Sequence, residues 1–383
     1  MKLQPVDIIN TIVMFQLLVF IYFLIKRKLN QQSKSIGQSN IILAIFLFVQ
    51  LLIIFDFECS HLSNEVIILT PHIFFIGTPF IFLAAPLFYL YVRSIAFSDF
   101  KFRNKDLLHG LPFAIAILIF AQRFYFLSSG AKETIIANHS LFSIIFWIGY
   151  NVILFSQLLI YFLIDLRILN YYREEIRQQY SSVSSINLSW LNFILYAFII
   201  AWLSSIVVFL SRNYFGSLYN QIQFVNFFAF FCFFNYIFYK GLSQPEIFSG
   251  IEEQPKYISS RLTETEAEKY LSELNTYMTE QKPYLNPTLA LKELASQISI
   301  SPRYLSQIIN EYTHQNFFDY VNRYRIEEAK RLFSENSSEK TVLEILYEVG
   351  FNSKSSFNTA FKKFTGVTPS HFKKKIMTPH SDV

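Results

Sequence analysis

Polar side chains that could read the edges of DNA bases gather in a short stretch in the first third of the last hundred residues. Arg, Gln and Asn can each form two parallel hydrogen bonds to guanine or adenine in the major groove. In this stretch they alternate with apolar residues at helical spacing, so one helix would expose them together. The candidate base-contacting residues on this first helix are Arg303, Tyr304, Ser306, Gln307 and Asn310.

A second set of the same kind follows about 51 residues later. Its candidates for contact with DNA are Lys354, Ser355, Ser356, Asn358, Thr359 and Lys362. Lys363 and Lys373 are better suited to phosphate contact, which positions a protein on DNA without reading its sequence. The plain alternative is that both sets are solvated helix faces. Their place on the second helix of each predicted unit favours DNA contact.

Each set needs a pair of short helices that hold it in place. Two apolar stripes flank the break at 299–302, where Ser301 can cap the new helix and Pro302 suits its first turn. This spacing predicts a helix-turn-helix over 289–310 and another over 341–364, joined by a helix over 317–333. The predicted core residues are Leu294, Ala295, Leu305, Ile308, Gly350, Phe351, Phe357 and Phe361.

Residues 282–379 resemble the DNA-binding domain of the AraC/XylS family of bacterial transcription regulators. The resemblance implies sequence-specific DNA binding by two recognition helices in successive major-groove faces, with double-stranded DNA and RNA polymerase as partners. Two positions depart from the family pattern: Leu346 replaces a small Ala, and Phe372-Lys373 replaces an aromatic-Arg pair. The motifs that carry the resemblance are Leu294-Ala295, Arg325–Ala329, Gly350-Phe351, Ser356-Phe357, Phe361–Lys363, Gly366–Pro369 and Phe372.

The composition of the whole chain points to a second, different part. Of its 383 residues, 52% are hydrophobic and only 16% are charged, where soluble domains carry about 25%. The 44 Phe and 23 Tyr exclude a disordered chain, and two cysteines exclude a disulfide scaffold. Residues 1–240 hold 26 of the charged residues and 241–383 hold 35, so the sequence divides into an apolar and a polar part.

Seven apolar runs in 1–240 are long enough, or nearly so, to cross a hydrocarbon core of about 30 Å. Lys and Arg are concentrated in the loops after the first, third and fifth runs, which places these loops and the C-terminal part in the cytoplasm and the N-terminus outside. We expect the buried amides of these runs, such as Gln16 and Asn235, to bond between helices. The predicted spans are 7–25, 41–57, 67–92, 107–127, 141–166, 188–210 and 222–239.

An acidic segment, 241–281, separates the two parts. It carries eight acids and three basic residues, while 282–379 has a basic surplus of five. Apolar residues at helical spacing and a capping box beginning at Thr263 predict a short amphipathic helix. That helix either pairs or transmits motion, or else is a connector packed on the next domain.

These observations predict an all-α protein: a seven-helix transmembrane bundle over 1–240, an acidic linker over 241–281 and a cytoplasmic double helix-turn-helix domain over 282–379. No catalytic, metal-ligand or cofactor motif appears, so we expect no enzyme, metal or cofactor. The expected function is transcription regulation from the inner membrane of a bacterium, controlled by an unidentified small-molecule or envelope signal, with the lipid bilayer and a second copy of the chain as further partners. The alternatives are a membrane carrier or membrane enzyme with a regulatory DNA-binding tail, and a bundle that only anchors.

Overall fold

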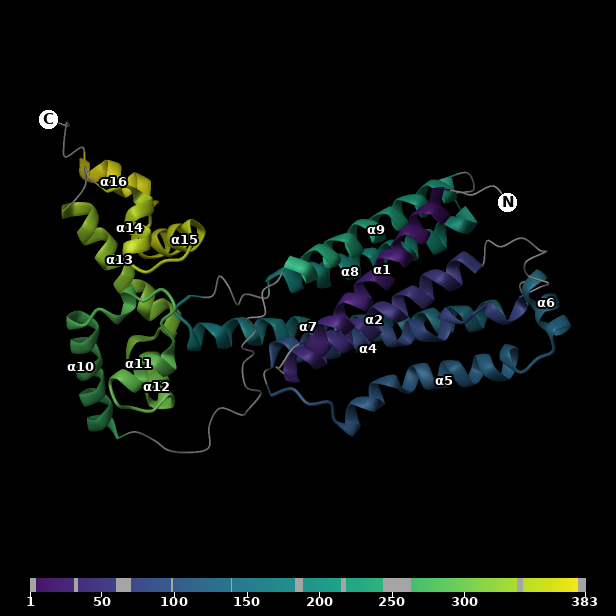
Figure 1. The fold of residues 1–383 in the computed structure, drawn as a ribbon, viewed down its shortest axis with the longest axis horizontal. Helices are drawn as coiled ribbons and strands as arrows, with labels where there is room; N and C mark the ends of the chain where they lie inside the picture. The colour runs from purple at the N-terminus through teal and green to yellow at the C-terminus, as the bar shows by residue number, and fades with distance from the viewer. Residues whose placement is uncertain are drawn as a thin grey trace. The chain divides into compact units, whose positions relative to one another are not determined.

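The computed structural model describes residues 5–30, 34–59, 70–97, 99–138, 140–182, 189–214, 218–243, 263–335 and 340–377. Over these ranges the named elements are all helices, which confirms the all-α class (Figure 1). The chain divides into two compact units. The first comprises Met1–Asn170 and Leu188–Glu253, and the second Tyr171–Asn187 and Gln254–Val383.

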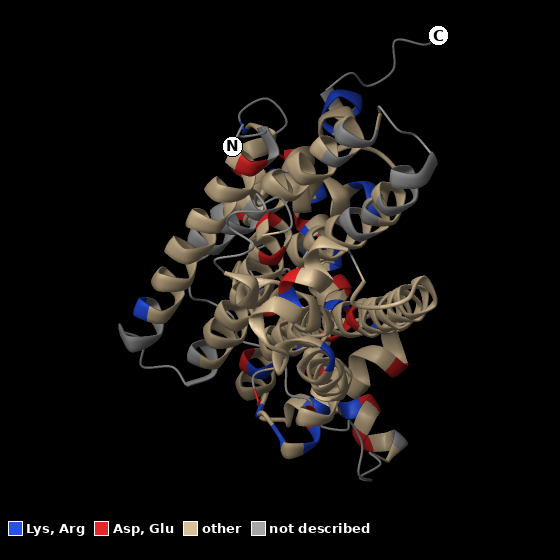
Figure 2. Cartoon of the chain, turned by 90° about the vertical axis from the view of Figure 1, so that its right-hand side faces the viewer, with Lys and Arg blue, Asp and Glu red and all other residues tan. Residues whose placement is uncertain are grey.

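The first unit is built from long apolar helices, with few charged residues along them (Figure 2). Single-turn or irregular helices interrupt the third and fourth apolar segments: α4 follows a 3-10 turn, and α5 lies between a 3-10 and a π turn. The elements are α1 (Pro5–Asn30), α2 (Lys34–Cys59), η1 (Pro71–Ile73), α4 (Gly77–Ala96), η2 (Asn104–Gly110), α5 (Leu111–Phe120), η3 (Ala121–Tyr125), α6 (Ser129–Ala137), α7 (Ile144–Gln179), α8 (Ser189–Tyr214) and α9 (Tyr219–Ser243).

Five helical segments of the described chain are long and apolar enough to cross a membrane, against the seven predicted. In α8 and α9 the apolar stretches found are shorter, Trp190–Ile200 and Phe224–Phe233. The count of seven is therefore not confirmed, although a helix lies at each predicted position. The five segments are Asp7–Lys26, Gln38–Cys59, Pro71–Ala96, Asn104–Tyr125 and Ile144–Gln179.

Several amide side chains bond between the helices of this unit, as expected, but the Asn151 amide donates within its own helix to the Trp147 carbonyl, and the Gln50 amide nitrogen has no partner among the described residues. Gln16 of α1 and Asn235 of α9 exchange hydrogen bonds of 3.3 Å, and Ser204 of α8 donates to Asn226 of α9 at 2.6 Å. In apolar surroundings such bonds hold helices in register, because the alternative is an unpaired polar group. These bonds join α9 to both α1 and α8.

Two acids near the end of α2 accept hydrogen bonds inside this unit. The Asp56 carboxylate accepts a hydrogen bond from the Thr78 hydroxyl at 2.5 Å, and Glu58 accepts one from the Asn10 amide at 2.5 Å.

The second unit packs its helices around two hydrophobic clusters, and α13 contributes to both. Phe317, Tyr320 and Val321 belong to the first cluster, while Ile326 and Phe333 belong to the second. A helix of 19 residues is about 28 Å long, so α13 joins two separate cores. The elements are α10 (Glu264–Glu280), η5 (Pro283–Leu285), α11 (Leu291–Gln297), α12 (Pro302–Thr313), α13 (Phe317–Glu335), α14 (Val342–Glu348), α15 (Lys354–Thr365) and α16 (Pro369–Met377), with the end of α7.

The amphipathic helix predicted at Thr263 is α10. The Thr263 hydroxyl caps it by accepting from the Glu266 backbone N–H, and the Glu266 carboxylate accepts from the Thr263 N–H. Leu274 and Met278 are fully buried in the first cluster of the second unit. This helix therefore packs on the next domain. The segment 244–262 of the predicted linker lies outside the described residues.

Candidate nucleic-acid interface

The first candidate recognition helix is α12, and its ends are fixed by the local sequence. The Ser301 hydroxyl accepts a hydrogen bond from the Tyr304 backbone N–H at 3.2 Å, and Pro302 occupies the first turn. His314, with φ of 52°, ends the helix in the left-handed region. Leu305, Ile308 and Ile309 are buried, so one face of α12 is fixed against the core. The opposite face is left for solvent or DNA.

The structure brings all five candidates of the first set onto α12. Arg303 is exposed, and the other four are half-buried. The Gln307 amide donates to both carboxylate oxygens of Glu311 at 3.2 Å, and the Asn310 amide donates to the Ser306 hydroxyl at 3.4 Å. A base edge would therefore have to compete with neighbours one helical turn away for Gln307 and Asn310.

The second candidate recognition helix is α15, which is built in the same way. The Ser353 hydroxyl accepts from the Ser356 N–H at 3.2 Å, and Gly366, with φ of 79°, ends the helix in the left-handed region. Phe357, Ala360 and Phe361 form its buried face. The exposed residues of the second set are Lys354, Ser355, Thr359 and Lys362, with Asn358 half-buried.

Ser356 also has a local role in capping its helix, which was not predicted from the sequence. Its hydroxyl donates to the Ser353 carbonyl at 2.9 Å, and it lies 2.9 Å from the Ser353 hydroxyl. It is half-buried at the start of α15. In this geometry Ser356 strengthens the N-terminal cap of the helix, and a contact with a base would cost these bonds.

The two lysines assigned to phosphate already have partners within the domain. The Lys363 ammonium lies 2.7 Å from the Asp319 carboxylate of α13. The Lys373 ammonium donates to the Lys340 carbonyl at 2.6 Å and is half-buried. Lys363 is 55% exposed at its side chain, so an added phosphate can still approach it. Lys373 serves first to fix α16 near the start of α14.

The eight predicted core residues are all buried. Six of them are fully buried at 0% exposure, Phe351 is 4% exposed, and Gly350 lies in the turn between α14 and α15. Leu346, which departs from the family pattern, is also fully buried in the second cluster. The larger side chain is therefore accommodated between the helices.

The lack of a side chain at Gly350 allows the two helix-turn-helix units to approach closely. Its φ of 88° is in the left-handed region, which favours glycine. A Cβ added there would lie 2.7 Å from the carbonyl oxygens of Tyr284 and Leu285, which lie in η5, just before the first helix-turn-helix. Only a residue without a side chain fits this approach.

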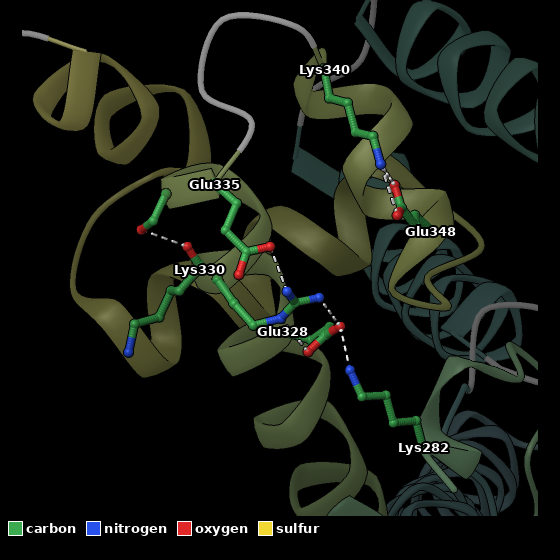
Figure 3. Close-up of polar contacts among 8 residues, drawn as sticks. Lys282, Glu328, Lys330, Glu335, Lys340 and Glu348 are labelled. Atoms are coloured by element: carbon green, nitrogen blue, oxygen red, sulfur yellow. Dashed lines mark hydrogen bonds and ion pairs between the residues drawn. The ribbon is translucent and has the colours of Figure 1, made fainter. Parts of the chain in front are cut away.

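Ion pairs along α13 add charge complementarity to this framework (Figure 3). Glu328 accepts from Lys282 at 3.0 Å and from Arg331 at 2.7 Å, so it links α13 to the residue that precedes η5. These bonds, that to Arg331 above all, lower the pKa of the Glu328 carboxyl from its usual value. On the other side of the unit Lys340 pairs with Glu348 at 2.7 Å.

Sequence reasoning missed the role of Arg325 of α13. It appeared only within a family motif, yet it is 1% exposed and bonds to residues of two segments outside its own helix, at Ser181 and at 284–286. Its position carries a signal: Arg325 is four residues from Val321 and four from Ala329, both fully buried. This spacing puts it on the buried face of the helix.

Comparison with known proteins identifies this unit. A family model described as a helix-turn-helix domain matches residues 294–375. The chain is 48% identical over 50 residues to an uncharacterized HTH-type transcriptional regulator in the cgkA 5′ region of Pseudoalteromonas carrageenovora. That alignment covers 13% of this chain and 28% of the relative.

One solved structure is also similar: the C-terminal domain of AraT, a response regulator from Geobacillus stearothermophilus. It shares 29% sequence identity and covers 32% of this chain and 95% of its own, with a TM-score of 0.26. That TM-score is too low to support a statement about the fold. On the family model, the C-terminal part of this chain carries a helix-turn-helix domain.

Proposed function

We propose that this protein is a membrane-bound transcription regulator that reads DNA through α12 and α15. The observation that carries the proposal is the pair of capped helices in a domain that matches the helix-turn-helix model. Each helix buries one apolar face and leaves Arg, Lys, Asn or Thr side chains on the other. In a helix-turn-helix the second helix enters the major groove, and these are the positions that meet the bases.

The proposal divides the basic residues by role. Arg303 on α12, and Lys354 and Asn358 on α15, are assigned to base edges because they lie in or near the first turns of their helices. Lys362 and Lys363, in the last turn of α15, are assigned to phosphates. Lys363 would exchange its partner Asp319 for a phosphate or share it.

The membrane part of the proposal rests on the apolar helices of the first unit. Five helical segments have the length and composition of membrane spans, and many of their large side chains are exposed, among them Phe15, Leu118 and Ile145. Exposed apolar side chains in such numbers need a nonpolar environment. We place this unit in the inner membrane of a bacterium as a seven-helix bundle, with the DNA-binding domain in the cytoplasm, where DNA and RNA polymerase are available.

Control by a signal is the least direct part of the proposal. The chain joins apolar helices to a DNA-binding domain, and no kinase or receiver motif separates them, so a small molecule or envelope stress sensed by the bundle would act on the domain directly. A second copy of the chain would extend the DNA site. If the bundle only anchors, deleting the first six predicted spans while keeping the seventh leaves signal-dependent transcription unchanged.

The carrier alternative has one observation in its favour. Arg93 and Asp106 form a buried ion pair at 3.2 Å, and Asp165 is 1% exposed. Buried ionisable groups in membrane proteins commonly mark transport paths. Flux measured across vesicles that contain the full chain distinguishes the two: transport of any solute that depends on Asp165 would favour the carrier.

The proposed function is tested with the full chain in lipid nanodiscs. The logarithm of the binding constant for its own upstream DNA should fall linearly with the logarithm of the salt concentration, because phosphate contacts release counterions. An excess of random DNA should compete less well than the upstream DNA. If the full chain binds no DNA at low salt, or binds all sequences with equal affinity, the proposal is wrong.

A further inference from the structure

The chain segment that follows α7 packs on the DNA-binding domain, within the second unit. Tyr180 forms an isolated antiparallel bridge with Ala290, at the start of α11. The Ser181 backbone N–H and hydroxyl both donate to the Leu289 carbonyl, at 3.1 and 2.6 Å. Ser181 is 1% exposed although it lies 108 residues away in sequence. This contact gives the domain a strand-like edge partner from another part of the chain.

Ser181 also completes the hydrogen bonding of a buried guanidinium. Arg325 has five N–H donors. Nε donates to the Tyr284 carbonyl, one Nη1 hydrogen bond goes to the Asn322 side chain, and one Nη2 bond goes to the Asn286 carbonyl. The remaining two donate to the Ser181 carbonyl and hydroxyl, both at 3.1 Å. Without Ser181, two donors of a 1% exposed cation lose their partners.

Arg325 lies where the two helix-turn-helix units meet. Tyr284 and Asn286, which accept hydrogen bonds from it, lie just before the first helix-turn-helix. Its guanidinium lies 5.5 Å from the ring centroid of Phe351, in the second helix-turn-helix. The close approach of Gly350 to the same Tyr284 carbonyl occurs at this junction. Whatever holds Arg325 in place therefore also holds the two units in one arrangement.

Two further contacts attach the same segment to the domain on either side of Ser181. The Arg177 guanidinium lies 5.8 Å from the ring centroid of Phe318 on α13. The Asn352 amide, at the start of the second unit's turn, donates to the Ser182 hydroxyl at 3.3 Å. The segment thus contacts α13, the residues just before α11 and the turn before α15.

We infer that residues 171–182 are a docking segment that binds the DNA-binding domain at Arg325 and fixes the arrangement of its two helix-turn-helix units. This inference rests on the proposed function only for its consequence, since the arrangement of α12 and α15 matters when both read one DNA site. The docking segment consists of the last part of α7, from 171 to 179, and the three residues that follow it. The whole of α7 is an unbroken helix of 36 residues. Such a helix is about 54 Å long, far more than the ~30 Å of a hydrocarbon core.

The helix α7 ends at Gln179, two residues before Ser181. Displacement of this end of α7 on the domain moves Ser181 relative to Arg325. Undocking exposes the Arg325 donors and loosens the junction at Phe351. The docked state is the one that presents α12 and α15 together, and undocking weakens DNA binding.

Docking itself is tested by a disulfide cross-link that does not depend on DNA. Ser182→Cys and Asn352→Cys are combined in the full chain, in nanodiscs, with Cys59→Ala and Cys232→Ala and a protease site inserted between Ser243 and Thr263. After oxidation and cleavage, a docked segment keeps the two fragments joined on a non-reducing gel. Ser182→Cys alone is the control. Two separate fragments from the double variant would overturn the inference.

The role of Ser181 is tested by hydrogen exchange in the full chain. Ser181→Lys places a second cation against the Arg325 guanidinium, so the segment must leave, while Gln178→Lys adds the same charge at a half-buried position three residues earlier, in the last turn of α7. We expect Ser181→Lys to speed exchange in 284–290 and 349–353 by roughly tenfold. Ser181→Ala, which keeps the carbonyl contact, should give a smaller increase in the same peptides, and Gln178→Lys none.

The remaining outcomes separate this inference from the proposed function. If Ser181→Lys leaves exchange in both peptides unchanged, the segment does not hold the junction and the inference is wrong, whatever the chain does with DNA. If exchange rises but the affinity of the full chain for its DNA stays within a factor of two of wild type, docking does not regulate and the inference is also wrong. If wild type binds no DNA while the cross-link and exchange results hold, the proposed function fails and the docking segment stands.

Discussion

Replacing Gly350 with Ala should damage the junction between the two helix-turn-helix units more than any other glycine substitution in the domain. The backbone at this position has φ of 88°, which costs a residue with a side chain about 1–2 kcal/mol. The added Cβ would also lie 2.7 Å from the carbonyl oxygens of Tyr284 and Leu285, so η5 has to move away. Overpacking of this kind adds about 1–3 kcal/mol.

Gly366→Ala is the matched control for the strain alone. Gly366 has φ of 79°, and an added Cβ would meet nothing within 4 Å. We therefore expect it to cost about 1–2 kcal/mol, the backbone contribution without the steric one. The difference between the two variants in free energy of opening measures the steric cost at the contact of Gly350 with η5. We expect this cost to be about 1–3 kcal/mol.

The assay is hydrogen exchange of buried amides in the second unit of the full chain, converted to free energies of opening. In Gly350→Ala the peptides that contain Tyr284 and Phe351 should both lose protection, because the two sides of the contact separate. In Gly366→Ala the loss should be confined to the end of α15. Equal losses in the two variants would refute the close approach described here.

Three other substitutions test the roles assigned above. Arg303→Ala should cost about 1–3 kcal/mol on the specific DNA site and little on random DNA in a binding titration, whereas equal losses on both would contradict base reading. Lys362→Ala should weaken binding to every sequence and reduce the slope of the salt dependence by about one, and an unchanged slope would rule out a phosphate contact. Glu328→Gln should remove an acid-dependent part of the domain's stability: the pKa of Glu328 is lowered in the folded domain, so its contribution is present above the usual Glu pKa and is lost as pH falls through the lowered value. Unfolding of the variant followed against pH should show a flatter acid limb than wild type, and identical limbs would count against the bonds to Arg331.

Local sequence signals predicted the helices that form the candidate interface. Ser301-Pro302 and Ser353 mark the starts of α12 and α15, and the apolar stripes behind them are buried as their spacing requires. Apolar run length was enough to locate the long helices of the first unit, but the predicted count of seven spans exceeds the five segments that qualify among the described residues.

Contacts between distant parts of the chain were beyond the reach of such signals. Ser181 meets Arg325 across 144 residues, and no periodicity links them. The pairing of Lys363 with Asp319 was not predicted, because Asp319 lies on a different helix, at a separation that a sequence pattern does not encode. The capping role of Ser356 was missed because base-contacting and capping serines occupy neighbouring positions at the start of a helix.

The most direct test of the account is a map of the DNA that the full chain binds while it is in the membrane. Cells are cross-linked, membranes are isolated, and the DNA recovered with the protein is sequenced, with a chain carrying Arg303→Ala and Lys354→Ala as control. The account predicts a small number of discrete sites that share a sequence and that disappear in the control. Recovery of the protein in the membrane fraction without enriched DNA sites, or the same DNA from the control, would contradict it.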